Sequence, residues 1–178
     1  MDKIREFMGI CPQHDVLFDL LTPHEHLDIF YDFKGGDPSR KQEEINRLIK
    51  GLDLNNDQYK NAFKLSSGNK RKLSASIALC GGSKFILLDE PTAGMDLNAR
   101  RKLWDMLRAY KKNKIILLTT HFMEEADILA DRIGIMSKGN LACLGSSYFL
   151  KNRFSVGYRI KFVKKQRKVS PALDAFIA

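Results

Sequence analysis

Two short stretches carry side chains that suit phosphate and metal chemistry. "FILLDEPTAGMD" places Asp89 and Glu90 directly after an apolar run, and "IILLTTH" places His121 directly after another. A carboxylate at the end of a buried strand can hold Mg²⁺, directly or through water, and a second one beside it can polarise a water for attack on a phosphoryl group. An imidazole at a neighbouring strand end can hold a phosphate oxygen or orient that water. Taken singly, each of these residues is also compatible with a solvated strand end.

Two further stretches could contact an anion or its metal ion. Gln13 in "GICPQHD" follows an apolar run, and its amide can ligate magnesium or hydrogen-bond a water, although most loop glutamines are only solvated. "KLSSGNKRKLS", residues 64–74, places two serines and a glycine before a basic helical pattern. A helix that begins in this way offers free backbone N–H groups, hydroxyl donors and the positive end of its dipole. The stretch therefore predicts an anion site.

The elements that position these residues follow from hydrophobic periodicity and from capping residues. Thr22, Pro23 and Glu25 predict a capped helix start, and Lys138-Gly139-Asn140 predicts a hairpin turn. The runs 85–89 and 115–120 lack polar alternation, so we expect both of their faces to be buried. We expect strands within 4–13, at 85–89, at 115–120 and on either side of the hairpin turn, and helices within 22–33, 39–52, 66–80, 98–111, 122–131 and 146–153. Alternation of strand and helix predicts a parallel α/β fold that binds ligands beyond the carboxyl ends of its strands.

The order of "CPQ", "LSSGNKRKLS", "ILLDEPTAGMD" and "LLTTH" closely resembles the nucleotide-binding domain of ABC ATPases, over about residues 4–165. "CPQHDVLFDLLTPHEHL", "GNKRKLS", "EEADILADRIGIMSKG" and "CLGSSYFLKNRF" look most like subfamily A of the ABC transporters, whose members mostly move lipids. The resemblance implies a P-loop NTPase-like parallel sheet with an inserted all-helical signature subdomain. It implies a partial ABC ATPase domain over 1–165, made of a helical signature subdomain (22–80), a core (81–145) and a C-terminal helix and strand (146–165), with a tail at 166–178.

The same resemblance implies a role for each candidate residue, with ATP and Mg²⁺ as cofactors. Gln13 would be the Q-loop glutamine, in contact with Mg²⁺ and the attacking water. Asp89 would end the Walker B strand and hold Mg²⁺, Glu90 would be the catalytic base, and His121 would be the switch histidine. Asp96 would end the D-loop, which crosses to a second nucleotide-binding domain.

The signature motif would be residues 65–69, and its Ser66, Ser67, Gly68 and Asn69 would contact ATP held by that second domain. The family's usual LSGGQ reads "LSSGN" here, and the serine in place of glycine costs little unless its φ is positive.

The second departure from the family pattern is that no stretch of the sequence reads GxxxxGK[ST], the phosphate loop. We therefore expect an N-terminally truncated piece of the domain, whose remaining strands expose a long apolar edge. Such a chain would be marginally stable and inactive by itself, yet it could still complete a partner's site with its signature residues.

Composition bounds the partners and the location. The net charge is +9, and residues 151–168 carry eight basic residues and no acidic one, which suits an anionic membrane surface, nucleic acid or a solvated strand face. No apolar run approaches the roughly 18 residues that span a bilayer. The favoured function is the ATPase domain of a lipid transporter, on the cytoplasmic side of a membrane and joined to transmembrane domains. One alternative is a soluble ABC ATPase that acts on ribosomes or nucleic acid, and of these two partners nucleic acid is disfavoured. The other alternative is a regulatory module without enzymatic activity.

Overall fold

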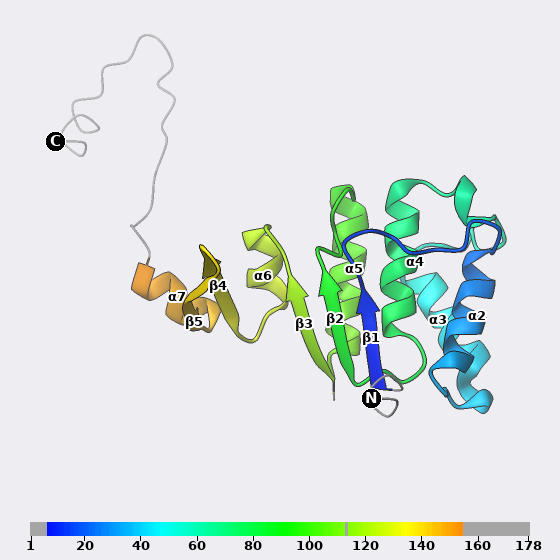
Figure 1. Cartoon of the computed structure of the whole chain (residues 1–178), viewed down its shortest axis with the longest axis horizontal. Helices are drawn as coiled ribbons and strands as arrows, with labels where there is room; N and C mark the ends of the chain where they lie inside the picture. The colour runs from blue at the N-terminus through cyan, green and yellow to red at the C-terminus, as the bar shows by residue number, and fades with distance from the viewer. Residues whose placement is uncertain (1–6, 113, 155–178) are drawn as a thin grey trace, which may run out of the picture.

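A three-stranded parallel sheet brings the candidate residues to one edge of the protein. The computed structural model describes residues 7–112 and 114–154, and its sheet consists of β1 (Met8–Cys11), β2 (Phe85–Asp89) and β3 (Ile115–Thr119), in that order (Figure 1). Cys11 pairs with Leu88, and Asp89 pairs with Thr119. Because the three strands run in the same direction, the segments that follow them all leave from one edge.

Helices α4 (Ser67–Leu79) and α5 (Leu97–Tyr110) cover one face of this sheet (Figure 1). Gly9 of β1 permits a close approach, since a Cβ built there would lie 1.8 Å from the carbonyl oxygen of Ala78 in α4. Residues 71–79 of α4 are all buried, because the helix lies between the sheet and other helices. Its N-terminus lies at the same end of the protein as the carboxyl ends of the strands (Figure 1).

The segment between β1 and α4 is helical, as predicted. It contains α2 (Pro23–Phe33), a 3₁₀ turn η1 (Pro38–Arg40), α3 (Lys41–Gly51) and a second 3₁₀ turn η2 (Ala62–Lys64). The predicted capping box is confirmed: the Glu25 N–H donates to the Thr22 hydroxyl over 3.2 Å, and the Thr22 N–H donates to the Glu25 carboxylate over 2.8 Å. The apolar residues of these helices belong to the same core as those of the sheet, so the helical segment is packed onto the strands.

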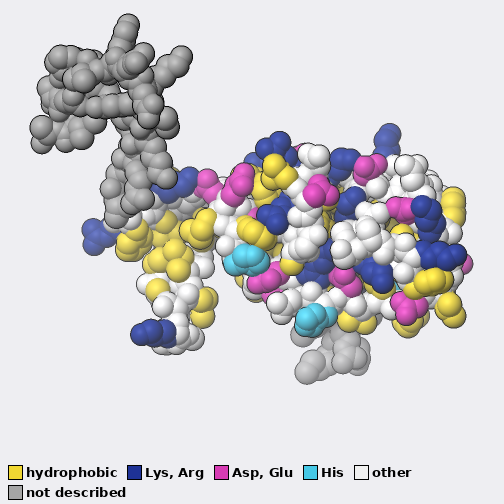
Figure 2. Space-filling view, turned by 90° about the horizontal axis from the view of Figure 1, so that it is seen from above, with side chains coloured by type: hydrophobic (Ala, Val, Ile, Leu, Met, Phe, Trp, Pro, Cys, Tyr) yellow, Lys and Arg dark blue, Asp and Glu magenta, His cyan; other side chains and the backbone are white. Residues whose placement is uncertain are grey.

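The C-terminal described elements extend to one side of this body (Figure 1). Helix α6 (Met123–Leu129) packs on α5, and β4 (Ile133–Ser137) and β5 (Asn140–Gly145) form an antiparallel hairpin followed by α7 (Ser147–Phe154). The hairpin turn is the predicted one, with positive φ at Lys138 and Gly139. Figure 2 shows apolar side chains gathered on this part, and the exposed large ones of β4, β5 and α7 are Met136, Leu141, Leu144, Tyr148, Phe149 and Phe154. The strand expected within 146–165, the tail 166–178 and most of the basic run 151–168 lie outside the described residues.

The expectation that the central strands are buried on both faces is wrong. Ile86 and Leu88 are buried under the helices, but on the opposite face Ile10 is 49%, Ile115 68% and Leu117 57% exposed. Both α4 and α5 pack on one face, and within residues 7–112 and 114–154 the other face is left open. The sheet therefore exposes an apolar face in addition to its edges. Among residues 7–112 and 114–154, none of the helices has the length and apolar character that a membrane crossing requires.

Candidate functional site

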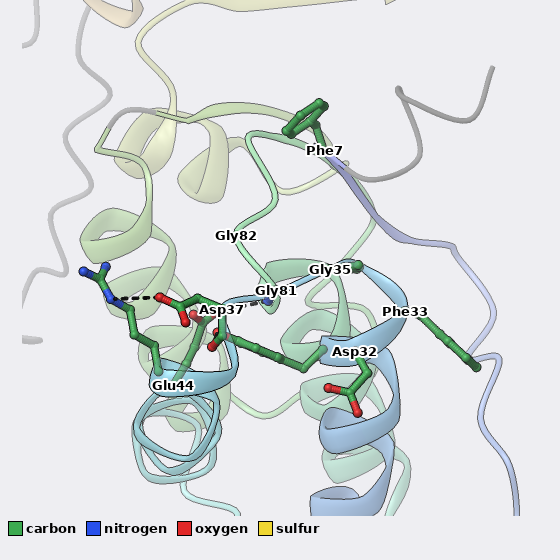
Figure 3. Close-up of a pocket in the computed structure, with 12 residues that line it drawn as sticks. Phe7, Asp32, Phe33, Gly35, Asp37, Glu44, Gly81 and Gly82 are labelled. Atoms are coloured by element: carbon green, nitrogen blue, oxygen red, sulfur yellow. Dashed lines mark hydrogen bonds and ion pairs between the residues drawn. The ribbon is translucent and has the colours of Figure 1, made fainter.

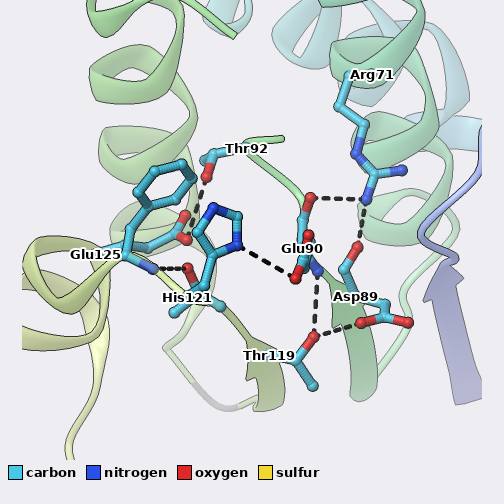
Figure 4. Close-up of polar contacts among 9 residues, drawn as sticks. Arg71, Asp89, Glu90, Thr92, Thr119, His121 and Glu125 are labelled. Carbon is cyan, nitrogen blue, oxygen red and sulfur yellow. Dashed lines mark hydrogen bonds and ion pairs between the residues drawn. The ribbon is translucent and has the colours of Figure 1, made fainter. Parts of the chain in front are cut away.

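The carboxyl edge of the sheet brings Glu90 and His121 into contact. The Glu90 Oε1 lies 3.2 Å from the His121 Nδ1, and the two side chains are 29% and 58% exposed, so an incoming ligand can reach both (Figure 4). Thr119 supports this arrangement, because its carbonyl oxygen and its hydroxyl both accept the Glu90 N–H, and its hydroxyl donates to the Asp89 carboxylate. The sequence motif did not point to Thr119, since its role depends on the pairing of β3 with β2.

The backbone turns sharply at Glu90, which has a φ of 46°. A residue with a side chain seldom adopts this left-handed conformation, and holding it costs on the order of 1–3 kcal/mol. The turn continues through a hydrogen bond of 3.1 Å from the Ala93 N–H to the Glu90 carbonyl. This conformation directs the Glu90 carboxylate across the sheet edge to His121.

A buried guanidinium lies behind the same edge. Arg71 of α4 is 3% exposed, and its Nη2 donates to the carbonyl oxygens of Asp89 and Glu90, the latter over 2.9 Å (Figure 4). Its Nη1 donates to the Pro12 carbonyl and to the Asp15 carboxylate over 3.1 Å. Sequence reasoning missed Arg71. The available signal was an arginine at the start of a helix whose following residues are almost wholly small or apolar, where a charge needs buried partners.

A second buried polar network fixes the segment that follows Glu90. The Glu125 carboxylate is fully buried and accepts the Thr92 hydroxyl over 3.2 Å (Figure 4). It also accepts the Trp104 indole N–H over 3.0 Å. These three residues come from α6, the turn after β2, and α5. The network therefore joins the helix that follows His121 to the turn that follows Glu90.

A stack of side chains supports His121 from its other side. Its ring centroid lies 4.0 Å from that of Phe122, and the Arg100 guanidinium lies 3.9 Å from the Phe122 ring. Arg100 Nε also donates to the Met95 carbonyl over 3.1 Å. The imidazole is thus linked through packed groups to the loop that precedes α5.

The N-terminus of α4 has the geometry of an anion site. Ser66 is the N-cap and its hydroxyl accepts the Asn69 N–H over 3.2 Å, while the N–H groups of Ser67 and Gly68 belong to the first turn, where no intrahelical acceptor exists. A Cβ built at Gly68 would meet nothing within 4 Å, so the space in front of it is open. Ser67 does not have a positive φ, so the serine at this position adds no backbone strain. The Asn69 side chain points back to Asp57, to which it donates over 2.6 Å.

Two further predicted residues lie at loop ends. Asp96 caps α5 by accepting the N–H groups of Asn98 and Ala99 over 2.8 and 2.9 Å, and the Ala99 N–H is the main cause of the lowered pKa of this carboxyl. Gln13 is exposed in the segment after β1. Within the described residues, the hydrogen bonds join Asp89, Glu90, Thr119 and His121, but they do not join the side chains of Gln13 or Ser66 to this group.

The oxygen ligands at the edge fit magnesium better than a transition metal. No group of three or more histidine, cysteine or acidic side chains that could hold a metal exists within the part of the chain that the structure describes. Mg²⁺ is commonly bound through one or two carboxylates, with waters and substrate phosphates as its other ligands. Asp89, at the end of β2, offers one such carboxylate, and Gln13 follows β1, the neighbouring strand.

A cavity in the described residues lies at the opposite end of the strands, where β1 and β2 begin. It measures about 590 Å³, and Phe7, Gly35, Gly81 and Gly82 line it (Figure 3). Its lysine, Lys34, is half-buried and donates to the carbonyls of Ala78 and Cys80 at the end of α4, and desolvation lowers its pKa. Its charged groups therefore already have structural partners, and the cavity is remote from Glu90.

Comparison with known proteins agrees with this geometry. Residues 1–93, slightly more than half of the chain, match the family model described as "ABC transporter". This chain belongs to the ABC transporter family. Among curated relatives, "Phospholipid-transporting ATPase ABCA3" of Rattus norvegicus is 48% identical over 165 residues, which cover 93% of this chain and 10% of that protein. "Cholesterol transporter ABCA5" of Mus musculus is 46% identical over 177 residues, 99% of this chain and 11% of that protein. The chain thus corresponds to a nucleotide-binding domain of subfamily A and spans about a tenth of the length of these relatives.

Solved structures support the fold. "Structure of ATP binding subunit of ABC transporter" superposes with a TM-score of 0.77 at 23% identity, over 86% of this chain and 64% of that one. "Structure of a bacterial Atm1-family ABC exporter with ATP bound" superposes with a TM-score of 0.70 at 23% identity, over 85% of this chain and 27% of that one. The predicted P-loop NTPase-like α/β fold is therefore confirmed.

Proposed function

We propose that this chain is part of the ATP-hydrolysing domain of a subfamily A transporter that moves a lipid across a membrane. The observation that carries the proposal is the pairing of Glu90 with His121 at the carboxyl edge of a parallel sheet, beside the Asp89 carboxylate. The printed names of the relatives, a phospholipid-transporting ATPase and a cholesterol transporter, support lipid as the substrate class.

The chain's residues divide the chemistry of hydrolysis among them. ATP bound with Mg²⁺ supplies the phosphoanhydride bond that water attacks. Glu90 accepts a proton from that water, and Asp89 and Gln13 would provide oxygen ligands for the metal. When the His121 ring is protonated, its Nδ1–H donates to Glu90 and its Nε2–H is left to donate to a phosphate oxygen.

The N-terminus of α4 serves a different nucleotide. We assign the Ser66 hydroxyl and the N–H groups of Ser67 and Gly68 to the phosphate of an ATP held by a second nucleotide-binding domain, with Asn69 bracing the loop through Asp57. The open space at Gly68 and the exposed helix end support this assignment. Asp96 would reach the same partner from the start of α5.

The transmembrane domains would dock on the segment between β1 and α2. Val16, Phe18 and Leu20 expose apolar side chains there, close in sequence to Gln13. This contact would place the domain on the cytoplasmic side of the membrane. The basic residues 151–168, most of them outside the described residues, would contact anionic lipid headgroups.

Hydrolysis needs one part that the 178 residues do not contain. No stretch reads GxxxxGK[ST], the loop whose backbone and lysine hold the β- and γ-phosphates. We infer that the chain by itself does not hydrolyse ATP, and that it does so when it is joined to such a loop. By itself it retains the α4 end that could complete a partner's site. The missing loop is the one feature that favours a regulatory module as the second candidate.

The test is ATP turnover by a protein in which this sequence is joined to a phosphate loop. Glu90→Gln should lower kcat by about 10² or more while nucleotide binding persists, because it removes the proton acceptor without removing a phosphate contact. Glu124→Gln, an exposed glutamate on α6, is the matched control and should turn over normally. A Glu90→Gln protein that hydrolyses ATP at the unmodified rate would overturn the assignment. Stimulation of turnover by phospholipid or cholesterol vesicles tests the substrate class separately.

A further inference from the structure

One buried side chain contacts the two loops that flank the proposed catalytic water. Arg71 of α4 reaches the backbone at Asp89 and Glu90 with Nη2, and the segment around Gln13 with Nη1, through Pro12 and Asp15. We propose that Arg71 is a positioning residue that holds Gln13 and Glu90 in a fixed relation to each other and to the N-terminus of α4. This inference rests on the proposed function and extends it to a residue outside the motifs.

The cost of burying this charge requires that its partners be specific. A guanidinium that is 3% exposed has lost nearly all of its hydration, so carbonyl and carboxylate oxygens must replace the water. Three carbonyl oxygens and the Asp15 carboxylate do so, and among the described atoms its Nε has no hydrogen-bond partner. The hydrogen bonds of the side chain are therefore directed at these two loops.

The contact with Glu90 acts where the backbone is strained. Arg71 Nη2 donates to the carbonyls on both sides of the residue whose φ is 46°. A left-handed backbone at a residue with a side chain persists only when surrounding contacts hold it. The carbonyls of Asp89 and Glu90 can both accept from Arg71 Nη2 only while the backbone keeps this conformation at Glu90. Releasing them would let Glu90 relax and would move its carboxylate away from His121.

The contact with the other loop extends this constraint to Gln13. Pro12 and Asp15, the acceptors of Nη1, lie on either side of Gln13 in the chain. Arg71 begins the buried part of the helix whose first turn is the proposed signature site at Ser66. A shift of α4 would therefore displace the backbone around Gln13 and around Glu90 together.

The substitution Arg71→Lys tests the role, because lysine keeps the charge but offers one nitrogen in place of a planar fork. In a protein that carries this sequence and a phosphate loop, we expect kcat to fall about tenfold or more while KM for ATP changes less than about threefold, since small displacements of catalytic groups carry large rate costs. Arg101→Lys, on the exposed side of α5, is the matched control. In a Glu90→Gln background the Arg71→Lys change should lower kcat by a clearly smaller factor than in the unmodified protein, because the part of its effect that acts through the Glu90 carboxylate is already lost.

A second measurement needs no turnover. Hydrogen exchange of the nucleotide-free protein should accelerate in peptides covering 12–17 and 89–95 in the Arg71→Lys variant, and stay unchanged in α5. Asp15→Asn removes the charge of one acceptor of Arg71, so it should accelerate exchange only in the peptide covering 12–17 and lower kcat by a smaller factor. This variant tests the proposal if Arg71→Lys does not fold.

Normal kcat in both variants, or additive losses in the Glu90→Gln background, would overturn the proposal for Arg71. Its failure is distinguishable from that of the proposed function, which fails only if turnover does not depend on Glu90.

Discussion

Replacing Gly9 by alanine would place a methyl group where the backbone of α4 already lies. A Cβ at Gly9 would be 1.8 Å from the Ala78 carbonyl oxygen and 2.7 Å from its carbonyl carbon. Carbon and oxygen atoms seldom approach closer than about 3.3 Å, so the shortfall is about 1.5 Å. Both obstructing atoms belong to a helix backbone, which cannot move aside as a flexible side chain can. The strand or the helix must therefore shift.

The cost follows from what this shift disrupts. Cys11, Ala78 and Leu79 are fully buried at the contact between β1 and α4, and interiors of this kind have few voids to absorb a displacement. Overpacking a core usually costs about 1–3 kcal/mol, and we expect the upper end or more here because backbone must move. A domain is stable by only about 5–15 kcal/mol, so Gly9→Ala removes a large share. Since Arg71 lies on α4 and Ser66 caps that helix, ATP turnover by a protein in which this sequence is joined to a phosphate loop should fall as well.

The single tryptophan, Trp104, is buried in α5 and reports unfolding by its fluorescence. In urea titrations, Gly9→Ala should lower the midpoint markedly at an unchanged slope. Gly51→Ala is the control, because there the new Cβ would meet only the terminal methyl of Met106, and a helical Gly→Ala change favours the helix. If Gly9→Ala and the unmodified chain unfold at the same urea concentration, the close packing of β1 on α4 is refuted.

Two other predictions concern the ends of α4 and α2. Gly68→Ala should leave the free energy of unfolding unchanged or raise it by up to about 1 kcal/mol, because residue 68 is helical and the space around it is open. The same change should lower ATP turnover, because the new methyl group obstructs the approach of a phosphate. A lower urea midpoint for Gly68→Ala would contradict the first expectation. The buried His26 ring donates from Nδ1 to the Thr22 carbonyl over 2.8 Å and accepts the Phe18 N–H at Nε2 over 2.9 Å, so it is neutral, and burial lowers its pKa from the ordinary value of 6.5. The unfolded chain therefore binds the proton more readily than the folded one. The free energy of unfolding should fall as the pH drops below about 6.5 towards the folded pKa of His26, whereas above pH 6.5 this histidine adds no pH dependence. His26→Gln should flatten that part of the pH profile in urea titrations, and a profile of equal slope in both proteins would show the reasoning to be wrong.

Local signals predicted most of the secondary structure. Thr22 and Glu25 form their capping box, Ser66 caps α4, and the turn at Lys138 and Gly139 joins two strands as expected. Each of these depends on residues within about four positions of one another, where short-range geometry decides the outcome. The contact between Glu90 and His121 was also predictable, because parallel strands end at a common edge.

Burial of the strands was not predictable in the same way. The runs that contain Leu87, Ile115 and Leu117 are apolar throughout, and such a pattern is compatible with cover on both faces. Only the packing of α4 and α5 on one face shows that Ile115 and Leu117 are exposed. A sequence pattern records which side chains tolerate burial, whereas burial itself depends on whether another element lies above them.

The sequence by itself determined the residue types at the proposed site, because Asp89, Glu90 and His121 follow strands whose order can be read from the chain. The tertiary structure decided which groups position these residues and the turn beside them. Thr119 does so because β3 pairs with β2, Glu125 because α6 packs on α5, and Arg71 because α4 packs on β1. These partners lie between about 18 and 60 positions apart, as in the contact of Arg71 with Glu90 or with Pro12. Contacts over such separations form only when the core closes around them, so no local pattern encodes them.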